Sequence, residues 1–263
     1  MHAVPRITAI AIALLAAVSA RPQSESQHVP PGPPTKTMPD MPYREMVKMM
    51  GMDDTAPIGM VLLDRLEWRG GAGADAGAWD GYAWYGGDYN KLWCKTEGER
   101  TRGRTEDARA ELLWDRIVTR WWSLQLGARQ DFGAGPPRRW AAIGVQGLAP
   151  QWFDIEAAIY AGDGGRTAAR FQAQYELLFT QRLILQPRLE ANLYGKGDPQ
   201  RGLGPGLSDL ELGLRLRYEI WREFAPYIGL DWRRAFGATA DFRRTDGENV
   251  GDARIVAGVR VWF

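Results

Sequence analysis

The feature that most constrains this chain is an alternation of apolar and charged residues along many of its segments. In Asp209 to Trp221, leucines occupy positions 210, 212, 214 and 216, and glutamates and arginines fill most positions between them. Successive side chains of a β-strand point to opposite faces, so a period of two indicates strands with one apolar and one polar face. Segments 167–179, 182–194 and 250–263 repeat the pattern. Helical spacing would scatter the charges, so we expect an all-β protein.

Twelve such segments follow one another from residue 58 onward: 58–69, 77–86, 89–99, 106–117, 120–131, 138–149, 151–161, 167–179, 182–194, 208–221, 225–236 and 250–263. Short connections such as Gly87-Asp88 alternate with longer ones such as Arg100 to Thr105. Tight turns at one end, longer loops at the other and an even strand number are typical of bacterial outer-membrane barrels. The sequence therefore predicts an antiparallel transmembrane outer-membrane β-barrel of about twelve strands, with about ten as the fallback because alternation weakens in 58–69 and 138–149.

The length of the segments favours a membrane barrel over a soluble one. About nine to eleven tilted residues cross the hydrocarbon layer, whereas soluble strands are nearer five or six. We expect the apolar parity to face lipid, with Cys94 on it as a small apolar residue. Aromatic residues near segment ends are expected to form interfacial girdles: Trp68, Trp114, Trp122 and Phe263. The charged parity should face the lumen, where carboxylates such as Asp154 and Glu156 pair with arginines rather than act in catalysis.

The N-terminal part of the chain has a different character. Arg6 precedes an apolar run from Ile7 to Val18, and small residues at the end of that run are typical of a signal-peptidase site. We predict a signal peptide over 1–20. Residues 21–56, rich in proline, serine and methionine, are predicted to form a flexible periplasmic arm, and 57–263 the outer-membrane barrel.

Composition excludes several classes of function. A net charge of +1 argues against nucleic-acid binding, because neutralising phosphates requires clustered excess basic residues. One cysteine excludes a disulfide framework. Without the predicted signal peptide, His28 is the remaining histidine, so hydrolases that use a histidine base are disfavoured. We expect no enzymatic activity.

Methionines are concentrated just before the barrel. Seven of the eight lie between positions 38 and 60: Met38, Met41, Met46, Met49, Met50, Met52 and Met60. Thioether sulfur is a soft ligand that favours Cu(I) over harder divalent ions. The alternative is an apolar helix face that docks against the barrel mouth, since methionine commonly fills gaps. Few other large apolar residues accompany these methionines, which favours metal capture.

Several long motifs resemble one known family, the outer-membrane copper resistance protein B. The motifs are LLDRLEWR (62–69), WDGYAWYGGDYNKLW (79–93), GVQGLAPQWFDIEAAIYAG (144–162), RLILQPRLEANLYG (182–195), LSDLELGLRLRYEIWREFAPYIGL (207–230) and the closing VAGVRVWF. The resemblance covers essentially all of 57–263. It implies an outer-membrane barrel that works with periplasmic copper-handling partners, including a multicopper oxidase, in resistance to excess copper. Members usually carry a segment rich in both methionine and histidine before the barrel, and this chain has only His28 there.

These observations lead to one expected function and one alternative. We expect a copper resistance protein of the cell outer membrane that binds or sequesters copper and assists its removal from the periplasm. The expected ligands are the seven methionines of 38–60, which favour Cu(I), with His28 as a further candidate. Copper ions, outer-membrane lipid and copper-handling proteins are the expected partners. The alternative is a narrow channel or porin without specific metal binding.

Overall fold

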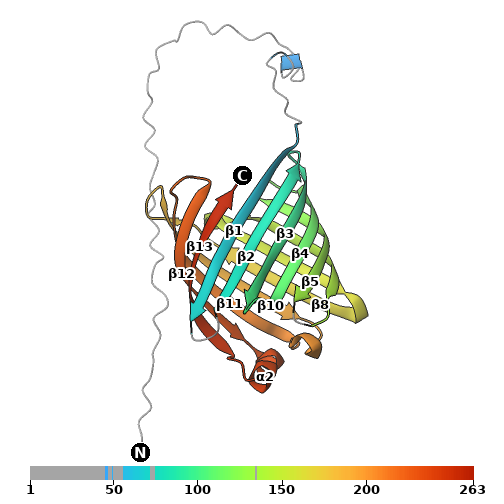
Figure 1. The fold of residues 1–263 in the computed structure, drawn as a ribbon. Coiled ribbons are helices and arrows are strands. Elements are labelled where there is room, and N and C mark those ends of the chain that lie inside the picture. The colour runs from blue at the N-terminus through green and yellow to red at the C-terminus, as the bar shows by residue number, and fades with distance from the viewer. Residues whose placement is uncertain (1–44, 47–48, 50–55, 72–74, 134) are drawn as a thin grey trace, which may run out of the picture. The chain divides into compact units, whose positions relative to one another are not determined.

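The computed structural model describes residues 45, 46, 49, 56–71, 75–133 and 135–263. The chain divides into two units, Met1–Met52 and Asp53–Phe263. The second unit is an antiparallel barrel (Figure 1). The predicted signal peptide and almost all of the predicted arm lie outside the described residues and stay predictions. No helix in the described part of the chain is long and apolar enough to cross a membrane.

The barrel is built from consecutive hairpins. Its strands are β1 (Ile58–Gly71), β2 (Ala76–Gly86), β3 (Asn90–Thr101), β4 (Arg104–Ile117), β5 (Trp122–Gly133), β6 (Arg138–Ala149), β7 (Phe153–Gly162), β8 (Arg166–Gln174), β9 (Leu177–Leu178), β10 (Leu183–Tyr194), β11 (Gly206–Tyr218), β12 (Phe224–Ala235) and β13 (Gly251–Trp262). The helical elements are η1 (Pro150–Trp152), η2 (Asp163–Gly165), η3 (Pro199–Arg201) and α2 (Gly237–Thr245). Pairing of β13 with β1 closes the sheet. Because β8 and β9 both pair with β10, the wall has 12 strand positions, as predicted.

Tyr175 and Glu176 separate β8 from β9, and a proline of the neighbouring strand β10 lies opposite this break. The registers Arg188 with Gln174 and Leu185 with Leu177 place Pro187 opposite Tyr175. Tyr175 N donates to the Pro187 carbonyl at 3.1 Å. Proline has no N–H to return that bond, so the ladder is interrupted there.

The two ends of the barrel differ, and each is named here by what it carries. The terminal end is where β1 begins and β13 finishes, and the loop end carries α2 (Figure 1). Only two loop-end connections are long, 195–205 and 236–250. The expected long connection over Arg100 to Thr105 is wrong, because β3 and β4 run on to a two-residue turn at Arg102 and Gly103. Both turn residues have positive φ, 51° and 80°, as tight hairpin turns require.

The two faces of the wall match the predicted parity. Outward side chains include Ile228, Leu230 and Ile255, which are 64%, 60% and 60% exposed. Charged residues of the other parity are buried in the lumen, and Arg217 is 1% exposed. Cys94 is exposed, on the outward parity of β3. The aliphatic outer face suits the hydrocarbon layer, where burial of apolar surface contributes about 25 cal/mol per Å².

Candidate functional site

Glu67 of β1 is the centre of one half of the buried ion-pair lattice in the lumen. Its side chain is fully buried and accepts hydrogen bonds from Arg215 Nε at 3.0 Å and Nη2 at 2.9 Å. Arg69 Nε donates to the same carboxylate at 2.8 Å, and Tyr227 Oη donates at 3.0 Å. Arg215 also contacts Asp231 at 3.2 Å. These residues come from β1, β11 and β12, so the contacts join strands distant in the chain.

Glu190 of β10 is the centre of the other half. It accepts hydrogen bonds from Arg170 Nε and Nη2 at 3.1 and 2.8 Å, and from Arg188 Nη2 at 3.0 Å. Arg170 and Arg109 also pair with Glu97. Such a lattice satisfies charges that would each be costly to bury alone. The expected pairing of lumen carboxylates with arginines is thus confirmed for Glu67, Glu97 and Glu190.

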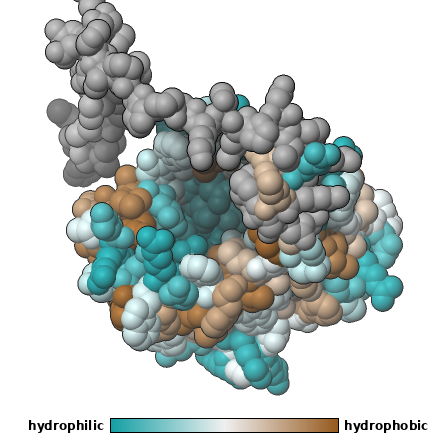
Figure 2. Space-filling model, turned by 90° about the horizontal axis from the view of Figure 1, so that it is seen from above, coloured by the Kyte–Doolittle hydropathy of each residue, from teal (hydrophilic) through white to brown (hydrophobic). Residues whose placement is uncertain are grey.

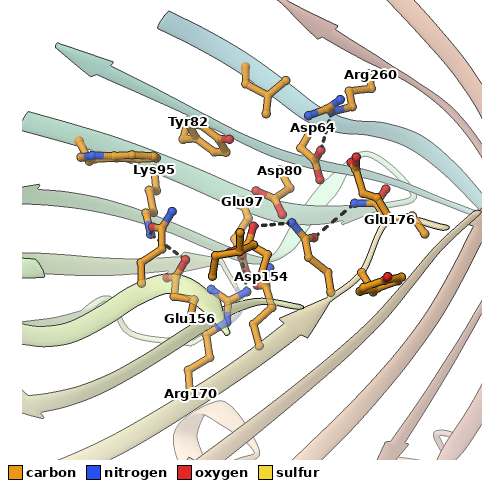
Figure 3. A pocket seen from close by; sticks show the side chains of 18 of the residues that line it. Asp64, Asp80, Tyr82, Lys95, Glu97, Asp154, Glu156, Arg170, Glu176 and Arg260 are labelled. Carbon is orange, nitrogen blue, oxygen red and sulfur yellow. Dashed lines mark hydrogen bonds and ion pairs between the residues drawn. The ribbon is translucent and has the colours of Figure 1, made fainter. Parts of the chain in front are cut away.

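A cavity of about 540 Å³ remains in the lumen. Seen from the terminal end, the barrel has a hydrophilic hollow (Figure 2). Figure 3 shows carboxylates and cationic groups of several strands directed into the cavity. Its charged lining comprises seven carboxylates, Asp64, Asp80, Glu97, Glu111, Asp154, Glu156 and Glu176, and four cations, Lys95, Arg109, Arg170 and Arg260. Asp80 and Glu176 also pair with Arg65, Arg188 and Arg217 of the surrounding lattice, so the lining carboxylates without an ion pair to a described cation are Glu111 and Asp154.

The carboxylates of the cavity are not equally paired. Glu156 binds Lys95 at 2.8 Å, and Asp64 binds Arg260 at 2.9 Å. Asp154, expected to be ion-paired, instead accepts a hydrogen bond from the Gln174 amide at 3.1 Å, and no ion pair joins it to a described cation. Because an amide carries no charge, the negative charge of Asp154 is the least compensated of these three.

Aromatic rings line one wall of the cavity. The rings of Tyr82 and Trp93 lie 5.0 Å apart, and Trp84 lies 6.4 Å from Trp93. The Lys95 ammonium lies 5.5 Å from the Trp93 ring centre, within cation–π range. Trp93 is buried, yet its Nε1–H has no hydrogen-bond partner among the described residues. Trp152 lines the cavity from a turn at the terminal end.

The loop end is covered by folded connections. Arg138 donates to Asp198 at 2.7 and 3.1 Å, which joins the β10–β11 loop to β6. These hydrogen bonds hold the pKa of Asp198 below its usual value. Thr239 of α2 accepts from Gly204 N at 2.8 Å and lies 3.0 Å from Ser208 Oγ. The lumen is thus more open at the terminal end than at the loop end.

The predicted metal ligands fall mostly outside the described residues. Met46 and Met49 are helical, and Met49 is exposed. Met60 lies in β1 opposite Trp84 of β2, two residues before the cavity-lining Leu62. The outside positions are His28, Met38, Met41, Met50 and Met52. The described residues hold no cluster of three or more histidine, cysteine or carboxylate side chains arranged for a metal ion.

The cavity was not anticipated from the sequence. Alternation marked its residues as lumen-facing, but it could not show which charges pair and which leave space. One signal in the sequence pointed to it: once adjacent strands are aligned, the neighbours of Asp154 are Leu148 and Gln174, and neither carries a positive charge.

A closed antiparallel barrel with an aliphatic outer face and a charged lumen defines an outer-membrane-type β-barrel protein. The NanC porin has a similar fold, with a TM-score of 0.50 and 11% identity over 77% of this chain and 98% of that one. This likeness concerns the fold alone.

The chain belongs to the copper resistance protein B family. The family model described as copper resistance protein B precursor matches residues 58–263. A copper resistance protein B homolog of Pseudomonas syringae pv. tomato is 51% identical over 210 residues, covering 80% of this chain and 71% of that protein. Copper resistance protein B of Escherichia coli is 48% identical over the same shares. Membership assigns a role in copper resistance.

Proposed function

We propose that the protein serves copper resistance from the cell outer membrane, with its terminal end toward the periplasm. The two faces of the wall suit a bilayer. Even-numbered positions of β11 carry leucines that face lipid, and odd-numbered positions of β12 carry charges that face the lumen. Outer-membrane barrels place short turns and both chain ends on the periplasmic side. In that orientation the arm and the cavity mouth meet periplasmic copper.

The arm collects Cu(I) through thioethers. The single observation that carries this proposal is the concentration of seven of eight methionines within 38–60, whereas residues 61–263 contain none. Thioethers stay unprotonated at periplasmic pH and prefer Cu(I). Met46 and Met49 are three apart in a helical segment, and residues so spaced lie on one face. The imidazole of His28 could add a nitrogen ligand.

The cavity supports the same function by electrostatics. Glu111 and Asp154 line it without an ion pair to a described cation, and such uncompensated carboxylates raise the local concentration of cations. Met60 is the third residue of β1, at the terminal end of the barrel, so copper released by the arm meets a cation-attracting compartment. The protein sequesters copper there and assists its removal, together with periplasmic copper-handling proteins such as a multicopper oxidase. Outer-membrane lipid surrounds the barrel, and nucleic acid is not a partner.

Competition between the full-length protein and a Cu(I) chelator tests this proposal. Replacing all seven methionines of 38–60 by Leu should abolish high-affinity binding, because leucine keeps apolar volume but has no sulfur. A matched control replaces the carboxylate pair Asp241 and Glu248 at the loop end by amides and should bind Cu(I) as before. Unchanged affinity in the leucine variant would sink the proposal.

A narrow channel is the second candidate, and the cavity is the observation that favours it. Planar-bilayer recordings distinguish the two functions. A channel gives copper-independent conductance in the wild-type protein, whereas a sequestering barrel closed by its lattice conducts little until residues such as Glu67 and Glu190 are replaced.

A further inference from the structure

The barrel wall has a notch at the terminal end, between β7 and β9. The β7–β8 pairing ends where Asp154 lies opposite Gln174. Beyond that point the chain continues through Tyr175 and Glu176 into β9, which pairs with β10 alone. The β9–β10 hairpin therefore extends past its neighbour β7, and one edge of β9 faces the notch.

The backbone of this edge carries unused hydrogen-bonding groups. Tyr175 N and Phe179 N donate to carbonyls of β10, those of Pro187 at 3.1 Å and Leu183 at 3.0 Å. Residues of an antiparallel ladder alternate in the side toward which their N–H and C=O point. Glu176 and Leu178 therefore direct these groups into the notch, where no described strand pairs with them.

The same edge exposes apolar side chains. Leu178 and Phe179 are 64% and 65% exposed, and neither lysine nor proline guards this short strand. Proteins usually protect free edges with such residues, because an unpaired apolar edge recruits another strand. Glu176 and Leu178 also line the cavity, so a strand added here would lie across its mouth.

The chemistry of the cavity indicates which side chains such a strand would carry. Asp154, in β7 beside the notch, lines the cavity and has no ion pair with a described cation; its hydrogen-bond donor is the uncharged Gln174 amide. The cavity already holds one ammonium group, that of Lys95, which lies near the Trp93 ring and contacts Glu156 of β7. The buried Trp93 Nε1–H has no hydrogen-bond partner among the described residues, and a peptide carbonyl in the cavity would accept a hydrogen bond from it.

We propose that the notch is a docking site for an extended, positively charged segment of another polypeptide. The segment adds a strand to β9 through Glu176 and Leu178 and places a basic side chain in the cavity near Asp154. The inference rests on the proposed function in one respect: the terminal end must face the periplasm for the notch to be exposed there.

Calorimetric titration of the full-length, copper-free protein in detergent tests this docking. The probe is an acetylated peptide of about ten residues with alternating threonine and lysine, an extended pattern. The lysine peptide should bind, and a glutamate counterpart should not. Leu178→Pro removes the N–H that faces the notch and should raise Kd at least tenfold, whereas Leu178→Ala keeps that N–H and should change Kd less than threefold.

A second measurement does not depend on the folding of a variant. Methylating alternate amides of the lysine peptide blocks its pairing with wild-type β9 and should abolish binding. Asp154→Asn should weaken binding, and the loop-end control Asp163→Asn should not.

Three results would overturn the proposal: equal binding of the glutamate peptide, equal binding of the methylated peptide, or a dimer of the protein that Leu178→Pro dissociates. The last would assign the notch to a second copy. Cu(I) affinity of the arm, measured on the same samples, reports separately on the proposed function.

Discussion

Replacing Glu67 by glutamine provides a sensitive test of the lumen lattice. The wild-type carboxylate is fully buried and faces both Arg69 and Arg215 at 2.8 to 3.0 Å. Glutamine keeps the shape but removes the charge, so Arg69 and Arg215 lose their nearest carboxylate and keep longer contacts with Glu99 and Asp231, each at 3.2 Å. Breaking a buried ion pair by removing one partner costs about 3 to 5 kcal/mol. We expect the free energy of unfolding to fall by about that amount.

Urea unfolding in lipid vesicles, followed by tryptophan fluorescence, measures this loss. Asp241→Asn is the matched control, because the Asp241–Arg244 pair at 2.5 Å is largely exposed. Exposed pairs contribute about 0 to 1 kcal/mol. Adding Arg215→Met to Glu67→Gln should recover part of the loss, because the cluster then loses one charge of each sign and Asp231 keeps Arg69 as a partner at 4.0 Å. A Glu67→Gln variant no less stable than the control would refute the claim that the lattice holds the lumen together.

Three further predictions address the lipid face, the loop end and the cysteine. Leu230→Arg places a charge on the outer face and should lower the stability in vesicles by about 2 to 4 kcal/mol, while a glutamine at the same position costs less. Because folding lowers the pKa of Asp198, its carboxylate stabilises the loop 195–205 above its unfolded pKa of about 4, and this contribution disappears as pH falls through the folded value. The protection of that loop against hydrogen exchange, corrected for the intrinsic exchange rate at each pH, should therefore fall on acidification, and Arg138→Gln should reduce the pH dependence. Cys94, exposed on the outward face of β3, should react in vesicles with a lipid-soluble maleimide and not with a charged one; the reverse preference would place it in water.

Period-two alternation was sufficient to predict the barrel and the direction of its two faces. In 209–221 each leucine is outward and each arginine inward, because the pleat offers only these two directions. Loop lengths were less predictable. Arg100 to Thr105 is polar and contains Gly103, as a long loop would be, yet strand pairing continues to a two-residue turn there.

Contacts between distant strands could not be predicted from the sequence. The pairing of Glu67 with Arg215 joins residues 148 positions apart, and no local pattern specifies it. The break between β8 and β9 could not be predicted either. Pro187 interrupts the hydrogen-bond ladder at the residue opposite it, Tyr175, and that register is not visible in the sequence. The cavity is the space left when such pairs are satisfied, so it follows from packing rather than from the order of residues.

Copper K-edge X-ray absorption of the Cu(I)-loaded, full-length protein tests the central claim most directly, because it identifies the atoms bound to the metal. The methionine arm predicts a first shell dominated by sulfur, which disappears when the seven methionines of 38–60 are replaced by Leu. A shell of nitrogen and oxygen alone in the wild-type protein would contradict thioether capture and move the copper site into the carboxylate-lined lumen.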